Sequence, residues 1–193
     1  MKIRESGMPA EDYWRTFFHP QHVLDQLDLA PNAGDVAEFG CGYGTFTIAA
    51  AGITRGLVHA IDIDPEMVAA TARNVEAAGL PNVRLHCRDF VREGSGLPRS
   101  SCGYAMLFNI LHATEPVLLL REAFRVLTPG GRLGMLHWNY DPSTPRGPSM
   151  EIRPRPDQCA AWAVEAGFSV ARPEIRSVGE YHYGIVAIRA KTP

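Results

Sequence analysis

The chain has 193 residues, 46% of them hydrophobic and 21% charged, which is typical of an ordinary globular protein. This length is enough for one well-buried domain and short for two, so we expect a single domain over residues 1–193. A formal net charge of -2 provides no broad basic field, which disfavours nucleic acid as the main partner.

The cysteines give no sign of a metal site or of a disulfide framework. They are far apart in the sequence and form no CxxC pair: Cys41, Cys87, Cys102 and Cys159. We interpret them as reduced residues of a reducing compartment. The first residues have no apolar run typical of a signal peptide, and no segment reaches eighteen apolar residues. We therefore expect a cytoplasmic protein that binds no metal and no membrane.

The first half of the chain alternates helical and strand patterns. Residues 11–29 have a helical pattern that we expect to break at Pro20, because proline cannot continue a helix interior. A short strand is predicted at 36–39 and a helix at 45–51. The stretch 57–63 is rich in branched apolar residues, as is typical of a strand that is buried on both faces.

The alternation continues through the middle of the chain. Asp64 and Pro65 predict a helix start, with aspartate as the N-cap and proline at the first helical position, and this helix should end at Gly79. Strands are predicted at 83–87 and 104–108.

The last part predicts one more helix and strand before an irregular segment. A helix that begins at about residues 114–116 is followed by the turn 128–131 and a strand at 132–138. A stretch rich in proline and arginine runs from 140 to 156, and a short helix ends at Gly167.

Two closing strands, at about 168–177 and 181–190, are joined closely enough to form an antiparallel hairpin. The five earlier strands with their helices predict an α/β fold, a parallel sheet with helices on both faces. We expect residues 35–193 to form this core and residues 1–30 to form a helical cap.

Ligands of such sheets bind at the carboxyl ends of the strands. The first of these ends carries glycine at three alternate positions, Gly40, Gly42 and Gly44, after Glu38. A dinucleotide fingerprint would place its third glycine at position 45, which is Thr45. An acidic neighbour disfavours a pyrophosphate and favours a nucleoside ligand that carries positive charge.

Two further strand ends carry aspartate. Asp62 ends the second strand, where a carboxylate can accept hydrogen bonds from both hydroxyls of a ribose. Asp89 and Phe90 follow the third strand, and they could bind an adenine through its amino group and its ring face.

In this order, the pieces DVAEFGCGYGTFT, VHAIDIDPEM, RDF and REAFRVLTPGGRLGM resemble the class I S-adenosylmethionine-dependent methyltransferases over about residues 35–140. The resemblance implies a Rossmann-like seven-stranded sheet of order 3-2-1-4-5-7-6 with strand 7 antiparallel. It implies S-adenosylmethionine as cofactor, with S-adenosylhomocysteine as its product. The implied cofactor contacts are Glu38, Gly40, Cys41, Gly42, Gly44, Asp62, Ile63, Asp89, Phe90 and Asn109.

The acceptor is expected to be a small molecule, because no large recognition domain is inserted. The fourth strand ends in FNILH, without the acidic or NPPY-type motif of many nucleic-acid methyltransferases. A general base is needed only if the nucleophile loses a proton, and His112 is the candidate, ahead of His137. Arg146, Arg153 and Arg155 could clamp an anionic group. The predicted substrate residues are Tyr13, Phe17, His112, Asn139, Tyr140 and Arg146.

Two other functions remain open from the sequence. One is a nicotinamide-dependent oxidoreductase, which Thr45 and Glu38 count against. The other is a module that binds S-adenosylmethionine without catalysis. The sequence does not indicate an oligomeric state.

Overall fold

The computed structural model describes residues 8–170 and 175–191. Its sheet has seven strands in the order β3-β2-β1-β4-β5-β7-β6, as predicted. Strands β1 to β5 pair in parallel, whereas β7 runs antiparallel to both β5 and β6. The strands are β1 Val36–Phe39, β2 Val58–Asp62, β3 Val83–Cys87, β4 Cys102–Phe108, β5 Leu127–Trp138, β6 Arg176–Val178 and β7 His182–Ile188.

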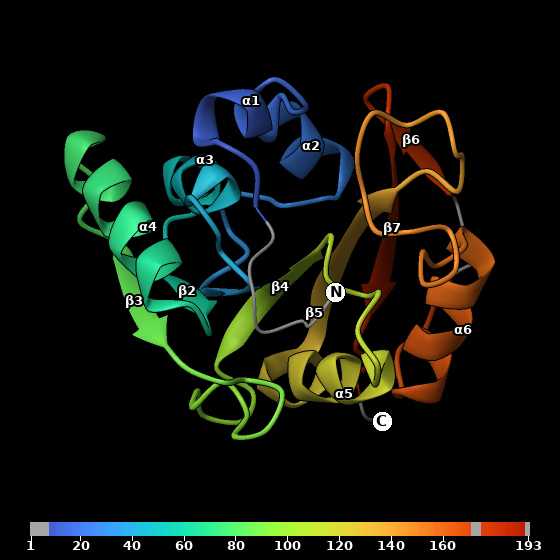
Figure 1. Ribbon diagram of the computed structural model, residues 1–193. Coiled ribbons are helices and arrows are strands. Elements are labelled where there is room, and N and C mark those ends of the chain that lie inside the picture. The colour runs from blue at the N-terminus through green and yellow to red at the C-terminus, as the bar shows by residue number, and fades with distance from the viewer. Residues whose placement is uncertain (1–7, 171–174, 192–193) are drawn as a thin grey trace.

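Helices cover both faces of this sheet (Figure 1). The helices are α1 Glu11–Arg15, α2 Pro20–Gln26, α3 Thr45–Ile53, α4 Pro65–Ala77, α5 Pro116–Val126 and α6 Pro156–Glu165. Side chains of α1, α2 and α3 form one hydrophobic core with the sheet, and those of α5 and α6 form a second core with its other face. Because each central strand is buried between these layers, its apolar residues need no alternation with polar ones.

Several helix boundaries follow the local chemistry of the sequence. The helical pattern of residues 11–29 is interrupted as predicted, with Pro20 as the first residue of α2. The Asp64 carboxylate accepts a hydrogen bond from the Glu66 amide (2.9 Å), which confirms Asp64 as the N-cap of α4.

Two predictions about strands need correction. Residues 128–131 are not a turn before β5 but part of it, since β5 begins at Leu127 beside Cys102 and its register shifts before Arg132. A continuous strand over 168–177 is wrong for the described part: Ser169 makes an isolated bridge to Ile188, and β6 has only three residues. The remainder of that prediction, at 171–174, lies outside the described residues.

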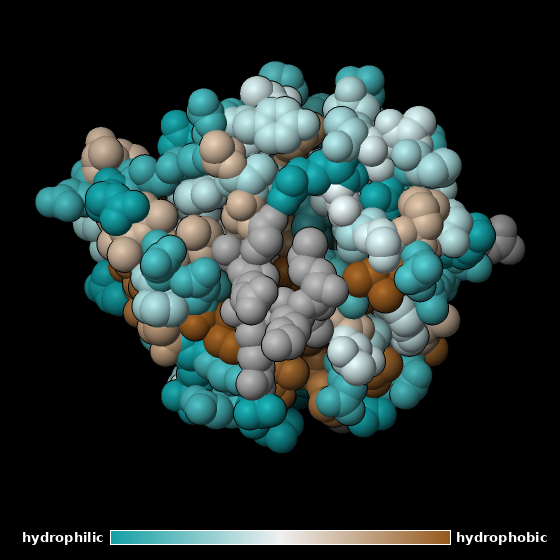
Figure 2. All heavy atoms as spheres, viewed as in Figure 1, coloured by the Kyte–Doolittle hydropathy of each residue, from teal (hydrophilic) through white to brown (hydrophobic). Residues whose placement is uncertain are grey.

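On the face drawn in Figure 2, hydrophilic residues dominate the rim and hydrophobic residues gather nearer the middle, around α5. None of the helices in the described ranges is long and apolar enough to cross a membrane.

Candidate active site

A pocket with a cavity volume of about 170 Å³ lies at the carboxyl ends of β1, β2, β4 and β5. The topology explains this position, because the chain leaves β1 and β4 toward opposite faces of the sheet and opens a crevice between them. The pocket is lined by Met8, Pro9, Trp14, Glu38, Gly40, Cys41, Gly42, Thr45, Phe46, Asp62, Ile63, Phe90, Phe108, Asn109, Ile110, His112, Leu119, Trp138, Arg146, Gly147 and Pro148.

The glycine turn between β1 and α3 is shaped by its backbone conformation. Gly40 and Gly44 have φ angles of 80° and 79°, in the left-handed region that favours glycine. A Cβ atom on Gly44 would lie 2.9 Å from Cγ2 of Thr71 on α4. The Thr71 hydroxyl donates a hydrogen bond to the Gly42 carbonyl (2.8 Å), so α4 fixes the turn from outside. The turn thus leaves bare backbone facing the pocket.

Asp62 joins the end of β2 to this turn. Its carboxylate accepts hydrogen bonds from the Gly42 amide (2.9 Å) and the Asp64 amide (3.0 Å). Burial raises the pKa of Asp62, and the hydrogen bonds from backbone amides oppose that rise. Each carboxylate oxygen has a second lone pair, so Asp62 can still accept a ligand hydroxyl.

Glu38 is the second acid of the pocket, and it is almost completely buried at the end of β1. The Thr47 hydroxyl on α3 donates a hydrogen bond to its carboxyl group. Burial raises the pKa of Glu38 to about 8, and the negative charge of Asp62 adds to this rise. A cation beside Glu38 would favour its ionised form, so this end of the pocket fits a positively charged ligand.

Asn109 follows β4 with a φ angle of 57°. Its amide N–H donates to the Leu136 carbonyl (2.7 Å), which holds the residue at the strand end. Both polar atoms of its side chain are buried and have no hydrogen-bond partner within the residues that the structure describes. Because a buried amide without partners is costly, a polar ligand atom in the pocket fits this position.

His112 and His137 meet behind the β4 end of the pocket. Their rings pack edge to face with centroids 5.6 Å apart, and His112 lines the pocket. Neither His112 Nδ1 nor either ring nitrogen of His137 has a hydrogen-bond partner in the described part of the chain. Burial lowers the pKa of His112 and lowers that of His137 well below its usual value. Both rings are therefore neutral at neutral pH, and His112 can accept a proton.

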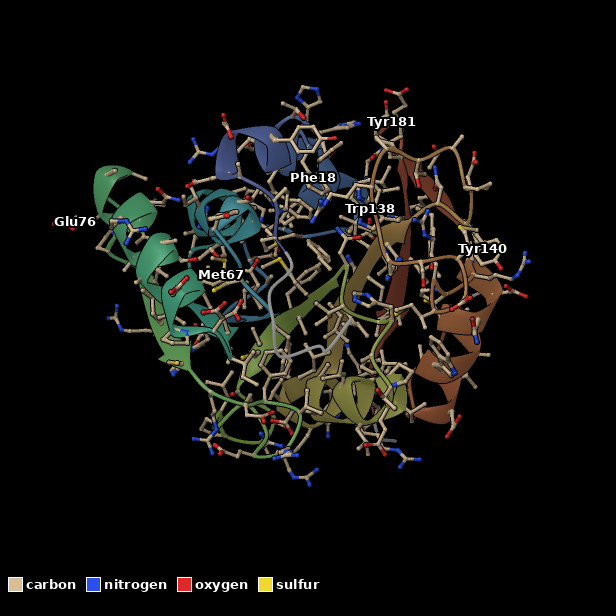
Figure 3. The ribbon with its side chains drawn as sticks, viewed as in Figure 1. Phe18, Met67, Glu76, Trp138, Tyr140 and Tyr181 are labelled. Atoms are coloured by element: carbon tan, nitrogen blue, oxygen red, sulfur yellow. The ribbon has the colours of Figure 1, made fainter. Side chains whose placement is uncertain are left out.

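Aromatic side chains that are not among the predicted site residues line the pocket near β4 and β5. Trp14, Phe46, Phe108 and Trp138 all contribute to this wall. Phe18 and Trp138 lie close together between α2 and the end of β5 (Figure 3), and the His182 ring contacts both.

The segment after β5 reaches the pocket with Arg146, Gly147 and Pro148. Arg153 organises this segment: its guanidinium donates to the carbonyls of Asn139 (3.0 Å), Asp141 (3.0 Å) and Pro148 (2.8 Å). The expectation that Arg153 clamps a substrate anion is therefore wrong, because its donors already bind backbone oxygens. Arg155 lies 3.7 Å above the ring of Tyr140.

Most of the predicted site residues line this pocket, and the structure brings together ten of them: Glu38, Gly40, Cys41, Gly42, Asp62, Ile63, Phe90, Asn109, His112 and Arg146. The others do not line it, namely Gly44, Asp89, Tyr13, Phe17, Asn139 and Tyr140. Gly44 is the N-cap of α3, and Asp89 accepts a hydrogen bond from the Arg92 amide. Their predicted roles stay predictions.

The predicted substrate residues outside the pocket have other contacts. Tyr13 is 46% exposed and packs on Phe17, whose ring contacts Trp138 (centroids 5.3 Å apart). Asn139 binds the Glu180 carbonyl through its side chain, and Tyr140 points toward α6 (Figure 3). Phe17 therefore supports the pocket wall from behind, whereas Tyr13 and Tyr140 lie away from it. Among residues 8–170 and 175–191, no group of three or more His, Cys, Asp or Glu side chains could hold a metal ion.

Comparison with known proteins assigns the chain to a family. The family described as "Methyltransferase domain" matches residues 36–131. A crystal structure described as a SAM dependent methyltransferase from Aquifex aeolicus has a TM-score of 0.81 and 25% identity, covering 97% of this chain and 97% of that one.

The chain matches only part of the length of its curated relatives. The ribosomal protein L11 methyltransferase of Methylococcus capsulatus is 38% identical over 119 residues, 60% of this chain and 38% of that protein. A 37.1 kDa protein in transposon TN4556 of Streptomyces fradiae is 36% identical over 133 residues, 67% of this chain and 37% of that protein. The chain thus spans less than two fifths of the length of these relatives.

The fold and the pocket define a Rossmann-like methyltransferase domain. The chain belongs to the class I S-adenosylmethionine-dependent methyltransferases, and S-adenosylmethionine is its cofactor. The bare glycine turn, the buried Glu38 and the unpartnered Asn109 amide fit a nucleoside with a cationic amino-acid end.

Proposed function

We propose that this chain transfers a methyl group from S-adenosylmethionine to a small-molecule acceptor in the cytoplasm. One observation carries the proposal: a single pocket has buried acids, Glu38 and Asp62, at its β1–β2 end and a neutral histidine, His112, at its β4 end. The bound cofactor supplies an electrophilic methyl carbon on a sulfonium. Catalysis then requires the chain to hold the nucleophile close and aligned, and to accept a proton where the nucleophile loses one.

In this proposal the residues divide into two groups. Asp62 holds the ribose hydroxyls, Ile63 and Phe90 flank the adenine, and Glu38 with the glycine turn holds the cationic amino-acid end. Asn109 offers its unpartnered amide to the same ligand. His112 faces the acceptor as the general base.

A small acceptor is supported by the enclosure of the pocket. Met8, Pro9 and Trp14 line it from the N-terminal segment, and Arg146 to Pro148 line it from the segment after β5. These two segments border the pocket, whose volume of about 170 Å³ suits a small acceptor better than a folded macromolecule. A second candidate, a protein acceptor, is favoured by the 38% identity to a ribosomal protein L11 methyltransferase.

Calorimetry with S-adenosylmethionine, S-adenosylhomocysteine and NAD tests the donor. Binding of both sulfur nucleosides is expected, and binding of NAD alone would instead support an oxidoreductase. Asp62→Ala should weaken S-adenosylmethionine binding at least tenfold. Asp64→Ala is the matched control, because Asp64 caps α4 and does not line the pocket. Equal affinities for the two variants would remove Asp62 from the ribose role.

A labelled-methyl assay tests the acceptor. The enzyme is incubated with labelled S-adenosylmethionine and either a metabolite extract or purified ribosomal protein L11. Label in small molecules alone is expected. Label in L11 would support the protein acceptor, and no label in either fraction, with cofactor binding intact, would favour a non-catalytic binding module.

A further inference from the structure

The acceptor end of the pocket is built from flat aromatic side chains. Trp14, Phe46, Phe108 and Trp138 line it, and none is more than 9% exposed. They come from four separate elements or their ends: α1, α3, β4 and β5. The wall is therefore a product of the tertiary fold rather than of one segment.

Each of these rings is held by another ring. Phe46 and Phe108 pack edge to face with centroids 4.8 Å apart, and Phe18 packs on Phe46 at 5.1 Å. Trp138 contacts the His182 ring at 4.2 Å and the Phe17 ring at 5.3 Å. Rings held by neighbouring rings lose little further freedom when a ligand binds. A planar aromatic ligand gains stacking and edge contacts with them that a puckered ring does not.

The charges along the pocket are unevenly distributed. Among the described lining residues, the carboxylates are Glu38 and Asp62, which both belong to the β1–β2 end. Arg146 is the charged residue at the β5 end. An acceptor with an ammonium group would meet the like charge of Arg146 at this end, so a neutral or anionic acceptor fits better.

His112 adds a requirement on the nucleophile. Its half-buried ring is neutral at neutral pH and lines the pocket beside Phe108 and Asn109. A general base contributes to methyl transfer only if the nucleophile carries a proton that it must lose. A hydroxyl group on the aromatic ring meets this requirement.

We infer that the acceptor is a phenol, a planar aromatic ring whose hydroxyl oxygen faces His112 while its ring lies against Trp138 and Phe108. This inference rests on the proposed methyl transfer. The phenol oxygen forms a bond to the methyl carbon as the carbon–sulfur bond breaks, and its electron pair stays on sulfur as a neutral thioether. The phenolic proton passes to the His112 imidazole, which takes over the positive charge of the sulfonium.

Binding of simple probes to the enzyme saturated with S-adenosylhomocysteine tests this class. The probes are 4-methylphenol, 4-methylcyclohexanol, which is puckered, and benzylamine, which is planar and cationic. Calorimetry should show 4-methylphenol binding at least tenfold tighter than either of the others. Equal or weaker phenol binding, with S-adenosylhomocysteine bound normally, overturns the inference and leaves the proposed function intact. Failure of S-adenosylhomocysteine to bind would refute the proposed function itself.

Variants of Trp138 locate the phenol. Trp138→Leu should weaken 4-methylphenol binding at least tenfold and change S-adenosylhomocysteine affinity less than twofold, and Trp138→Phe should restore most of the loss. Trp162→Leu is the control, because Trp162 lies on α6 and does not line the pocket. If Trp138→Leu fails to fold, Trp138→Phe decides: it should bind 4-methylphenol within about fivefold of the parent protein and keep the preference over 4-methylcyclohexanol. If Trp138→Leu weakens 4-methylphenol binding no more than Trp162→Leu does, the placement of the phenol ring against Trp138 is wrong.

Discussion

At the scale of single residues, the burial of Glu38 has the clearest chemical consequence. The folded chain keeps this carboxyl group protonated at neutral pH, since burial raises its pKa to about 8. Thr47 offers it one hydroxyl donor, which is less than the hydration that an ionised carboxylate has in water. The cost of ionising Glu38 therefore makes its protonation state depend on what binds beside it.

Cofactor binding should release a proton from Glu38. A cationic amino-acid end beside the carboxyl group lowers its pKa, so the affinity for S-adenosylmethionine should rise with pH up to about 8. Calorimetry at pH 7 in two buffers of different ionisation enthalpy measures the protons released. Glu38→Gln should release about one proton fewer than the parent. Equal proton release by the two proteins would contradict this role of Glu38.

At the scale of elements, α3 has a glycine near each end. The stability of the fold should depend on Gly44, which is the N-cap of the helix, and not on Gly52, which lies near its C-terminal end. Gly44→Ala should destabilise the fold by about 1–3 kcal/mol, because it places a side chain at positive φ and against Thr71. Gly52→Ala, in the same helix with open space around it, should stabilise by about 0.5–1 kcal/mol. Urea denaturation measures the free energy of unfolding of both variants. A loss of stability in both would mean that the packing of added side chains around α3, and not the backbone conformation of Gly44, determines the effect.

The segment after β5 provides a second prediction at this scale. Arg153→Lys removes the planar fork that binds three carbonyl groups, so Arg146 and Pro148 should lose their fixed positions. We expect the KM for the acceptor to rise several-fold while S-adenosylmethionine affinity stays unchanged. The exposed Arg121, which pairs with Glu165 on the surface, provides the control Arg121→Lys. Parallel losses of both affinities would show that Arg153 supports the whole fold.

The elements were predictable where their chemistry is local. Pro20, Asp64 and the glycine turn mark their boundaries through φ restriction, capping and positive φ, and the order of strands followed from the family resemblance. The roles of Arg153 and Trp138 were not predictable, because each depends on partners that only the tertiary fold brings near. The sequence suggested an anion clamp for Arg153, because the Asn139 carbonyl that its guanidinium binds lies 14 residues away in the chain.

At the scale of the whole molecule, three histidines that are far apart in the sequence are removed from solvent by the fold, His112 partly and the other two almost completely. His112 follows β4, His137 lies in β5 and His182 begins β7. Burial lowers the pKa of all three, that of His182 to about 3. The folded protein thus resists protonation at these positions and, at Glu38, resists deprotonation.

The stability of the ligand-free protein should therefore be greatest near about pH 6.5. As the pH falls below that value, the unfolded chain protonates these histidines and the folded chain does not, so stability decreases. As the pH rises toward 8, the unfolded chain has an ionised Glu38 and the folded chain does not, so stability again decreases. Urea denaturation at pH 5, 6.5 and 8 measures both sides. His182→Phe should reduce the loss of unfolding free energy between pH 6.5 and pH 5. An unchanged loss would contradict the role of His182 in the acid sensitivity.

The wall around the acceptor has an engineering consequence. Trp14, Trp138 and Arg146 lie outside residues 36–131, the part that matches the methyltransferase domain family, whereas Glu38 and Asp62 lie inside it. In the proposed function the acceptor site therefore combines flanking residues with Phe46, Phe108 and His112 of the matched part, whereas the donor contacts Glu38 and Asp62 lie in the matched part. Exchanging the flanks between relatives should change the choice of acceptor and leave the affinity for S-adenosylmethionine as it is.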